Sequence, residues 1–239
     1  MVTSHGTCTS PSTSLVIPAY NEENRIISVF EEIARYDGEL IIVCDGTDST
    51  AELVEQIANR RGDLQIRCLR FEHRLGKGGG VIEGLKAAQA PLVGFVDADG
   101  STGIDEMVRL FSHLSSCDGA IGSRWIPGSE LRVPQSPFRR LESRCFNLFV
   151  RVFFGLAYHD TQCGAKVFKK SAIDAVLPEM VSRGFEFDVE LLWRLCRAGF
   201  TLEEIPIKWQ NKGDSRVESR DILRMLSSLI SIRLHPCFT

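Results

Sequence analysis

The chain has 239 residues, of which 44% are hydrophobic and 25% charged, and its formal net charge at pH 7 is −3. This length fits one large domain or two small ones, and the composition is that of an ordinary globular protein. The slightly acidic balance excludes a protein that binds nucleic acid through an overall basic field.

The amino terminus and the cysteines narrow the protein class further. Residues 1–13 are polar and rich in Ser and Thr, which predicts a flexible leader rather than a signal peptide. No run reaches the roughly 18 apolar residues of a membrane span, so we expect a soluble or peripheral chain.

The eight cysteines are widely spaced, which excludes the paired ligands of a zinc site. Several fall in apolar patterns and should be buried, and the sequence leaves disulfides open.

The first hundred residues alternate between short apolar strands and helices. We expect strands at residues 14–17, 40–44, 64–70 and 92–96, with helices that begin near Asn21 and that span 49–61 and 81–88. This order predicts an α/β fold with a mostly parallel sheet and helices on both faces.

Three acidic turns follow strands of this predicted sheet: PAYNEE (18–23), CDGTDST (44–50) and VDADGST (96–102). The carboxyl ends of parallel strands lie at one edge, where α/β proteins bind ligands. Acidic turns with a purely structural role would be spread over both edges. Their clustering therefore favours a binding site.

The third turn carries the strongest chemical signal. Asp97 and Asp99 follow an apolar strand, and Gly100 releases the chain into a turn. Side-chain alternation puts both carboxylates on one side. Two oxygen ligands at this spacing suit a divalent cation that also binds substrate phosphates. The alternative is an Asp-rich turn that caps a helix predicted at 104–114.

The segment HRLGKGGG (73–80) is a Gly-rich turn with one lysine, Lys77. It matches neither the GxxxxGK[ST] spacing nor a GxGxxG motif after a first strand. We expect Lys77 and neighbouring backbone N–H groups to hold phosphates or their metal shell. The alternative is a flexible loop before the helix.

A basic segment comes next. A strand at 120–125 ends in Arg124, a loop spans 127–137, and an apolar helix is predicted at 138–158. Arg140, Arg144 and Arg151 share one stripe of that helix. Such a stripe either binds an anion, such as a phosphate or a lipid head group, or is a solvated helix face.

The remaining elements are a strand at 165–168, helices at 171–177 and within 184–196, a strand at 201–209 and an amphipathic helix at 221–234. Pro206 predicts that the strand lies at a sheet edge. Glu186, Asp188 and Glu190 are either first-turn charges of their helix or functional carboxylates. The final helix either docks on the domain or lies on a membrane surface.

Together these segments resemble a family 2 glycosyltransferase of the GT-A fold. More narrowly they are similar to the dolichyl- or polyprenyl-phosphate hexose synthases, the group of dolichol-phosphate mannose synthase and dolichyl-phosphate glucosyltransferase. The similarity is carried, in the family's order, by PAYNEE, VDADGST, GSRW, DTQCG with KVFKK, GFEFDVELL, and EIPIKW with GDSRV. It implies a catalytic domain at 14–218 and an amphipathic, membrane-interfacial helix at 219–239.

The resemblance also implies roles for individual residues. The nucleotide-sugar site would comprise Pro18, Ala19, Tyr20, Asn21, Glu22, Asp45, Lys77, Asp97, Ala98, Asp99 and Arg216. Asp97 and Asp99 would bind Mg²⁺ or Mn²⁺, with Ser101 at the position of a further ligand. The acceptor phosphate would lie against Arg124, Arg140 and Arg144, of which Arg124 and Arg140 join the two aspartates as the catalytic set.

The implied reaction moves mannose or glucose from GDP-mannose or UDP-glucose to a polyprenyl phosphate, with inversion. A phosphate acceptor is already an anion and needs no base, whereas a hydroxyl acceptor does. Asp188 and Asp160 are the candidate bases for that second reaction. A nucleotide-sugar-binding module without activity is a further alternative.

A lipid acceptor implies a membrane-associated enzyme with a cytoplasmic catalytic domain. The helices predicted at 138–158 and 221–234 are the expected contacts with the bilayer surface. No nucleic-acid partner is expected.

Overall fold

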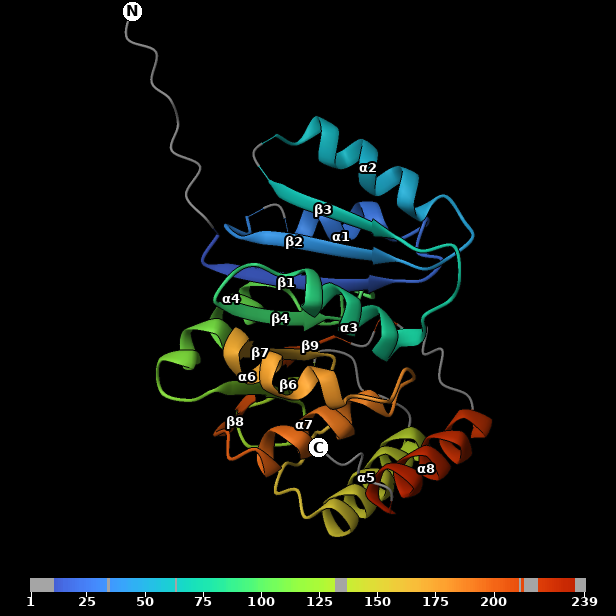
Figure 1. The fold of residues 1–239 in the computed structure, drawn as a ribbon, viewed down its shortest axis with the longest axis vertical. Helices are drawn as coiled ribbons and strands as arrows, with labels where there is room; N and C mark the ends of the chain where they lie inside the picture. Colours follow the sequence, from blue (N-terminus) through green and yellow to red (C-terminus); the bar gives the residue numbers. More distant parts are fainter. Residues whose placement is uncertain are drawn as a thin grey trace, which may run out of the picture.

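The computed structural model describes residues 11–33, 35–62, 64–131, 137–210, 212 and 219–234, with side chains left undescribed at 137–143 and 219–223. Its centre is a seven-stranded sheet of order β3-β2-β1-β4-β7-β5-β8 (Figure 1). The strands are β1 (Thr13–Ala19), β2 (Glu39–Cys44), β3 (Gln65–Arg70), β4 (Leu92–Val96), β5 (Gly119–Ser123), β7 (Ala165–Lys169) and β8 (Leu202–Pro206). Only β7 runs antiparallel to its neighbours, β4 and β5, so the predicted mostly parallel sheet is confirmed.

Helices cover both faces of the sheet (Figure 1). One face packs against α1 (Ile26–Glu32), α2 (Thr50–Arg60) and α4 (Ile104–Ser112), which the short 3₁₀ turn His113–Ser115 follows. The other face packs against α3 (Gly76–Ala87), α6 (Lys170–Val176) and α7 (Phe187–Arg197); a second 3₁₀ turn, Leu177–Glu179, follows α6.

Side-chain alternation along the strands explains the two layers. Leu15 and Ile17 of β1 belong to the core on the α1 side, whereas Val16 between them belongs to the core on the α3 side. All three are fully buried. A central strand covered on both faces therefore reads as a continuous apolar run in the sequence.

Helices α5 (Pro137–Phe154) and α8 (Ser219–Leu234) lie side by side beyond α7 (Figure 1). Arg233 Nε on α8 donates to the carbonyl of Phe153 on α5 at 3.4 Å. One stripe of each helix joins the α3-side core, at Phe146, Val150 and Phe154 of α5 and Met225, Leu229 and Ile232 of α8. Among the described residues, no helix has the length and apolar content needed to cross a bilayer.

The structure corrects two sequence expectations about loops. The Gly-rich segment is not a turn that precedes a helix, because α3 already begins at Gly76. The loop expected at 127–137 contains a short strand, β6 (Glu130–Leu131), which pairs in parallel with β9 (Lys208–Trp209). Pro206 ends β8 at the sheet edge, as predicted.

Candidate functional site

The predicted acidic turns meet at one edge of the sheet. Strands β1, β2 and β4 are parallel neighbours, so the turns that follow them share that edge. Asp97 directly follows β4, and its backbone N–H donates to the Gly164 carbonyl at 3.1 Å. A Cβ atom on Gly164 would lie 1.9 Å from Asp97 Oδ2, so only glycine leaves room for this carboxylate. The DTQCG segment thus shapes the aspartate site.

Asp97 is the outer end of a chain of alternating charges. Lys77 Nζ on α3 lies 2.8 Å from Asp97 Oδ1 and 3.7 Å from Asp188 Oδ2. The other Asp188 oxygen, Oδ1, lies 2.5 Å from Lys166 Nζ on β7. Lys166 and Asp188 are almost completely buried, which requires such pairing because an isolated buried charge costs several kcal/mol or more.

Asp99 is half-buried in the turn beside Asp97. Its pKa is raised above the ordinary value because burial disfavours the ionised carboxylate and the negative charge of Asp97 adds to that effect; hydrogen bonds from Ser101 oppose it. The Ser101 backbone N–H donates to Asp99 Oδ1 at 2.8 Å. Two carboxylates that repel each other at a polar edge are a natural counterpart for a cation.

Asp97 and Asp99 suit a divalent cation for which the protein would supply only some of the ligands. Asp97 and Asp99 supply hard oxygen ligands, as Mg²⁺ and Mn²⁺ prefer. No group of three or more His, Cys, Asp or Glu side chains within the described ranges has a metal-holding arrangement. Ser101, the further ligand suggested by resemblance, is buried and bonded to Asp99. Substrate oxygens and water would therefore complete the coordination.

The start of α3 corrects one expectation. We expected backbone N–H groups near Lys77 to hold phosphates, but protein acceptors take them: Gly76 donates to Asp45 Oδ2 at 3.2 Å, Gly78 to the Gly184 carbonyl at 3.2 Å, and Gly79 to the Arg183 carbonyl at 3.0 Å. The Lys77 side chain faces the site, with Nζ 2.8 Å from Asp97 Oδ1.

Asp45 follows β2 and helps to anchor α3. Its Oδ2 accepts from the backbone N–H groups of Leu75 and Gly76 at 2.8 and 3.2 Å. Asp45 was expected to contact the base or ribose of a nucleotide, and its buried position beside the first turn of α3 gives it a structural task as well.

The turn after β1 is tied to the turn after β2. Pro18 and Ala19 end β1, and Asn21 adopts a left-handed conformation with φ 53°. Asn21 Oδ1 accepts from the Thr47 backbone N–H at 2.9 Å, so this side chain joins the two turns rather than capping α1. Tyr20 lies under the Arg74 guanidinium, 4.1 Å from ring centroid to Cζ.

Two further residues of the expected donor site are buried. The backbone N–H of Glu22 donates to Thr50 Oγ1 at 2.8 Å, and its carboxylate pairs with Arg25 at 2.8 Å. Ala98, between the two aspartates of the third turn, packs in the core on the α1 side.

Arg124 follows β5 and forms a buried ion pair with Asp160. Its Nε and Nη2 lie 2.7 and 2.8 Å from the two Asp160 oxygens, and its backbone N–H also donates to Asp160. Burial alone would lower the pKa of Arg124, but Asp160 outweighs it and raises that pKa; Asp97 contributes in the same direction. The DTQCG segment therefore holds Asp97 at one end and Arg124 at the other.

Aromatic rings link Arg124 to the helix α5. The Arg124 guanidinium lies 5.8 Å from the Trp125 ring and 5.4 Å from the Trp209 ring. Arg144, exposed on α5, lies 5.6 Å from the same Trp125 ring. Two arginines on different elements thus share one tryptophan, an arrangement that suits an anion next to apolar surface.

The candidate bases are already engaged. Asp188 pairs with Lys166 and Lys77, and Asp160 pairs with Arg124. Both carboxylates are inaccessible to solvent in this arrangement. Their pairing stabilises the charged site rather than leaving an exposed group that could take a proton.

Two of the expected site residues remain predictions. The side chain of Arg140 and all of Arg216 lie outside the described residues.

Two contributors to the site were not predicted from the sequence: Lys166, which neutralises Asp188, and Gly164, which makes room for Asp97. A lysine inside an apolar strand was the available signal for Lys166, since a buried lysine needs a carboxylate partner.

Several known proteins resemble this chain. A family model described as "Glycosyl transferase family 2" matches residues 14–177. The glycosyltransferase AglD of Haloferax volcanii is 35% identical over 91% of the chain, which spans 36% of that protein's length. The dolichyl-phosphate beta-glucosyltransferase of Saccharomyces cerevisiae is 32% identical, covering 92% of this chain and 74% of the yeast protein. The polyprenol monophosphomannose synthase of Mycolicibacterium smegmatis is 30% identical, with coverages of 88% and 82%.

Solved structures share the fold. The glucosyl-3-phosphoglycerate synthase of Mycobacterium tuberculosis, in complex with Mn²⁺, UDP and glucosyl-3-phosphoglycerate, superposes with a TM-score of 0.66 at 20% identity and covers 95% of this chain and 79% of that one. The similarity confirms the predicted GT-A architecture.

Proposed function

We propose, from the premise that this chain belongs to glycosyl transferase family 2, that it moves a hexose from a nucleotide sugar to a polyprenyl phosphate. The names of the yeast and mycobacterial relatives support this acceptor class. A glucose donor is the first choice because dolichyl-phosphate beta-glucosyltransferases recur among the relatives, and mannose is the second.

One observation carries the proposal: the site has an acidic half and a basic half held by the same segment. Gly164 borders Asp97, and Asp160, four residues earlier, pairs with Arg124. The acidic half suits a cation that neutralises the donor diphosphate. The basic half, which continues to Arg144 through Trp125, suits the phosphate of the acceptor.

The pairing of both candidate bases favours a phosphate acceptor over a hydroxyl acceptor. An oxygen of the acceptor phosphate attacks the anomeric carbon of the sugar, and the bond from that carbon to the nucleoside diphosphate breaks with inversion. The phosphate arrives as an anion, so no proton has to be removed. Arg124 and Arg144 would orient it and reduce its repulsion from the donor diphosphate.

A divalent cation on Asp97 and Asp99 would stabilise the negative charge that builds on the departing nucleoside diphosphate. The pKa of Asp99, which burial and then the charge of Asp97 raise, supports such a cation. The mycobacterial protein of similar fold was solved in complex with Mn²⁺, which also supports a divalent cation here. Lys77 would add a positive charge beside the same phosphates.

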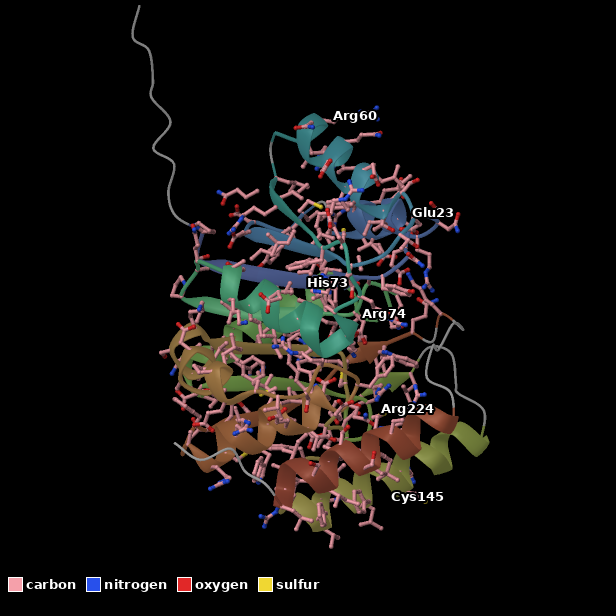
Figure 2. All side chains as sticks on the ribbon, turned by 45° about the vertical axis from the view of Figure 1, so that its right-hand side comes forward. Glu23, Arg60, His73, Arg74, Cys145 and Arg224 are labelled. Atoms are coloured by element: carbon pink, nitrogen blue, oxygen red, sulfur yellow. The ribbon has the colours of Figure 1, made fainter. Side chains whose placement is uncertain are left out.

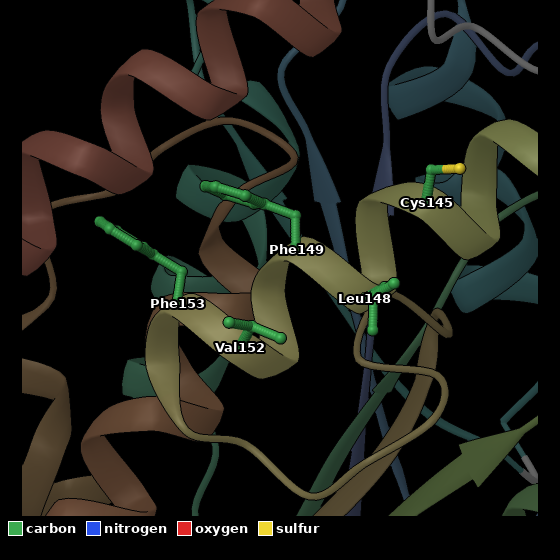
Figure 3. Close-up of a pocket in the computed structure, with 5 residues that line it drawn as sticks. All are labelled: Cys145, Leu148, Phe149, Val152 and Phe153. Atoms are coloured by element: carbon green, nitrogen blue, oxygen red, sulfur yellow. The ribbon is translucent and has the colours of Figure 1, made fainter.

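The outer helices support contact with a membrane surface. Leu148 and Val152 on α5 are exposed by 60% and 77% and lie one helical turn apart, which leaves a hydrophobic strip. Figure 3 shows them with Cys145, Phe149 and Phe153 on the same helix. Figure 2 places Cys145 and Arg224 on the α5–α8 pair, far from Arg60 on α2.

Exposed arginines accompany this strip, at Arg144 on α5 and at Arg224 and Arg233 on α8. Apolar side chains flanked by cations suit a bilayer that contains anionic lipids. We therefore propose that the enzyme works at a membrane surface with its catalytic domain on the cytoplasmic side.

The test is a transfer assay with phytanyl phosphate as acceptor and UDP-glucose or GDP-mannose as donor, with Mg²⁺ or Mn²⁺ and with a chelator. We expect metal-dependent formation of phytanyl-phosphate hexose. Asp99→Asn should abolish turnover and leave the circular dichroism spectrum unchanged. Transfer that a chelator does not affect would contradict the metal, and transfer to a hydroxyl acceptor alone would contradict the acceptor.

Arg144 provides a sharper test of the basic half. Arg144→Ala should raise the KM for phytanyl phosphate several-fold and leave the KM for the donor near its original value, because Arg144 belongs to the proposed acceptor half through its contact with Trp125. Arg60→Ala, on the distant helix α2, is the matched control (Figure 2). An equal change in both KM values would count against the acceptor role.

A further inference from the structure

The Lys77 ammonium group contacts the carboxylate of Asp97, to which a divalent cation would also bind. Lys77 Nζ lies 2.8 Å from Oδ1 and 3.2 Å from Oδ2, so it bridges both oxygens of the carboxylate. The Lys77 side chain is only 16% exposed, and Asp97 is 35% exposed. The pair is therefore shielded enough from water to matter energetically.

The backbone on both sides of Lys77 is held in place, and the side chain has a second carboxylate close by. The adjacent residues Gly76 and Gly78 are anchored to Asp45 and to the Gly184 carbonyl. A second carboxylate, Asp188, already lies 3.7 Å from Nζ. Lys166 holds Asp188 from the other side, so this alternative partner is fixed.

Charge makes the two occupants of Asp97 exclusive. A divalent cation bound to Asp97 and Asp99 would lie close to the ammonium group, and like charges in a partly buried site repel more strongly than in bulk water. The ammonium group would have to leave Asp97. Asp188 and the phosphates of an incoming nucleotide are the acceptors within its reach.

We propose that Lys77 is an exchangeable counter-ion that competes with the divalent cation for Asp97 until a nucleoside diphosphate draws it away. This inference rests on the metal dependence of the proposed function. The negative charge of Asp97 is thereby compensated in the free enzyme, and metal and nucleotide bind cooperatively because each favours the same position of Lys77.

The experiment measures Mn²⁺ binding to the full chain by electron paramagnetic resonance of the free ion, with and without UDP or GDP. Without nucleotide, Lys77→Met should bind Mn²⁺ about tenfold more tightly than the original protein, equivalent to about 1.4 kcal/mol. Addition of nucleotide should strengthen Mn²⁺ binding strongly in the original protein and much less in the variant.

Lys86→Met is the matched control, since Lys86 lies on the same helix and pairs with Glu83 outside the site. It should bind Mn²⁺ like the original protein. Lys77→Gln, which keeps a hydrogen-bond donor without the charge, serves as a second variant if the methionine variant does not fold.

Equal or weaker nucleotide-free Mn²⁺ binding by the Lys77 variants, in a protein that binds Mn²⁺ with nucleotide, would overturn the counter-ion role alone. A protein that binds no Mn²⁺ even with UDP and GDP would overturn the metal dependence of the proposed function, and this inference with it. The two failures are thus distinguishable without any measurement of sugar transfer.

Discussion

At the scale of single residues, the site depends on a glycine that sequence reasoning did not single out. Gly164 accepts the backbone hydrogen bond of Asp97 and leaves no space for a side chain beside its carboxylate. A methyl group 1.9 Å from Asp97 Oδ2 would force the carboxylate or the strand end to move. The position of Asp97 is therefore set by a residue that is far away in the sequence.

We expect Gly164→Ala to weaken nucleotide-dependent Mn²⁺ binding by about tenfold or more, because a ligand displaced by an ångström loses most of its binding contribution. Isothermal titration with Mn²⁺ and UDP or GDP measures this. Gly62→Ala is the control, since a Cβ atom at Gly62 meets nothing within 4 Å. Unchanged binding in Gly164→Ala would show that the carboxylate is not held by this contact.

The buried pair of Lys166 and Asp188 is a second determinant at this scale. Lys166 has no exposed surface, and its ammonium group bonds the Asp188 carboxylate and the Cys163 carbonyl. Removing one partner of a buried pair strands the other charge, which costs about 3–5 kcal/mol. Replacing both partners by apolar groups costs far less by the same reasoning.

Lys166→Met should therefore lower the free energy of unfolding by about 3 kcal/mol or more, measured from urea denaturation. The double variant Lys166→Met with Asp188→Leu should recover part of that loss. If the loss in the double variant equals the sum of the losses in Lys166→Met alone and Asp188→Leu alone, the two charges do not stabilise each other in the folded protein.

At the scale of elements, helix α3 shows how tertiary contacts override local preference. It begins within a run of glycines, which are poor helix formers. Two of them permit close packing: a Cβ atom on Gly78 would lie 2.5 Å from Phe187 Cβ, and one on Gly84 would lie 2.2 Å from Val16 Cγ1. The helix thus lies close against β1 and α7, which brings Lys77 to the aspartates.

Gly84→Ala tests this balance between propensity and packing. Alanine gains about 1 kcal/mol of helix propensity over glycine, whereas overpacking a core contact costs about 1–3 kcal/mol. We expect a net loss of stability, seen as a lower Tm. Combining it with Val16→Ala should relieve the clash, so the two substitutions together should cost less than the sum of their separate effects. A higher Tm for Gly84→Ala alone would mean that propensity dominates here.

At the scale of the whole molecule, the α5–α8 pair forms an outer layer that packs one stripe on the core and leaves apolar side chains exposed. Phe146 and Val150 face the core, whereas Leu148 and Val152 face outward. A helix that is apolar on both sides has a second surface to cover. The proposed cover is the membrane that carries the lipid acceptor.

Val152→Asp should reduce binding to phosphatidylcholine vesicles that contain phosphatidylglycerol by several-fold, measured by co-sedimentation, because a charge opposes insertion of the strip. Val108→Asp is the matched control: this valine is 52% exposed, but on α4 at the other face of the sheet. Equal loss in both variants, or in neither, would contradict docking through α5.

The sequence alone determined the alternation of strands and helices, the mostly parallel sheet and the edge at which the acidic turns gather. These follow from local periodicity and from the geometry of parallel strands, which act over a few residues at a time. Asp97 and Asp99 were found in the same way, because they lie in the turn after an apolar strand, whereas the role of Arg124 came from the family resemblance. The family resemblance named the chemistry that such a set would perform.

Only the tertiary structure decided how these residues are partnered. The bond between Arg124 and Asp160, the chain from Asp97 through Lys77 to Asp188, and the space at Gly164 all join segments far apart in sequence. Such partners depend on where the sheet brings strand ends together and on which buried charges must be neutralised. A local pattern can mark a charge that needs a partner, as it does for Lys166, but it does not say which residue the partner is, so the counter-ion of the aspartate site became visible only in the fold.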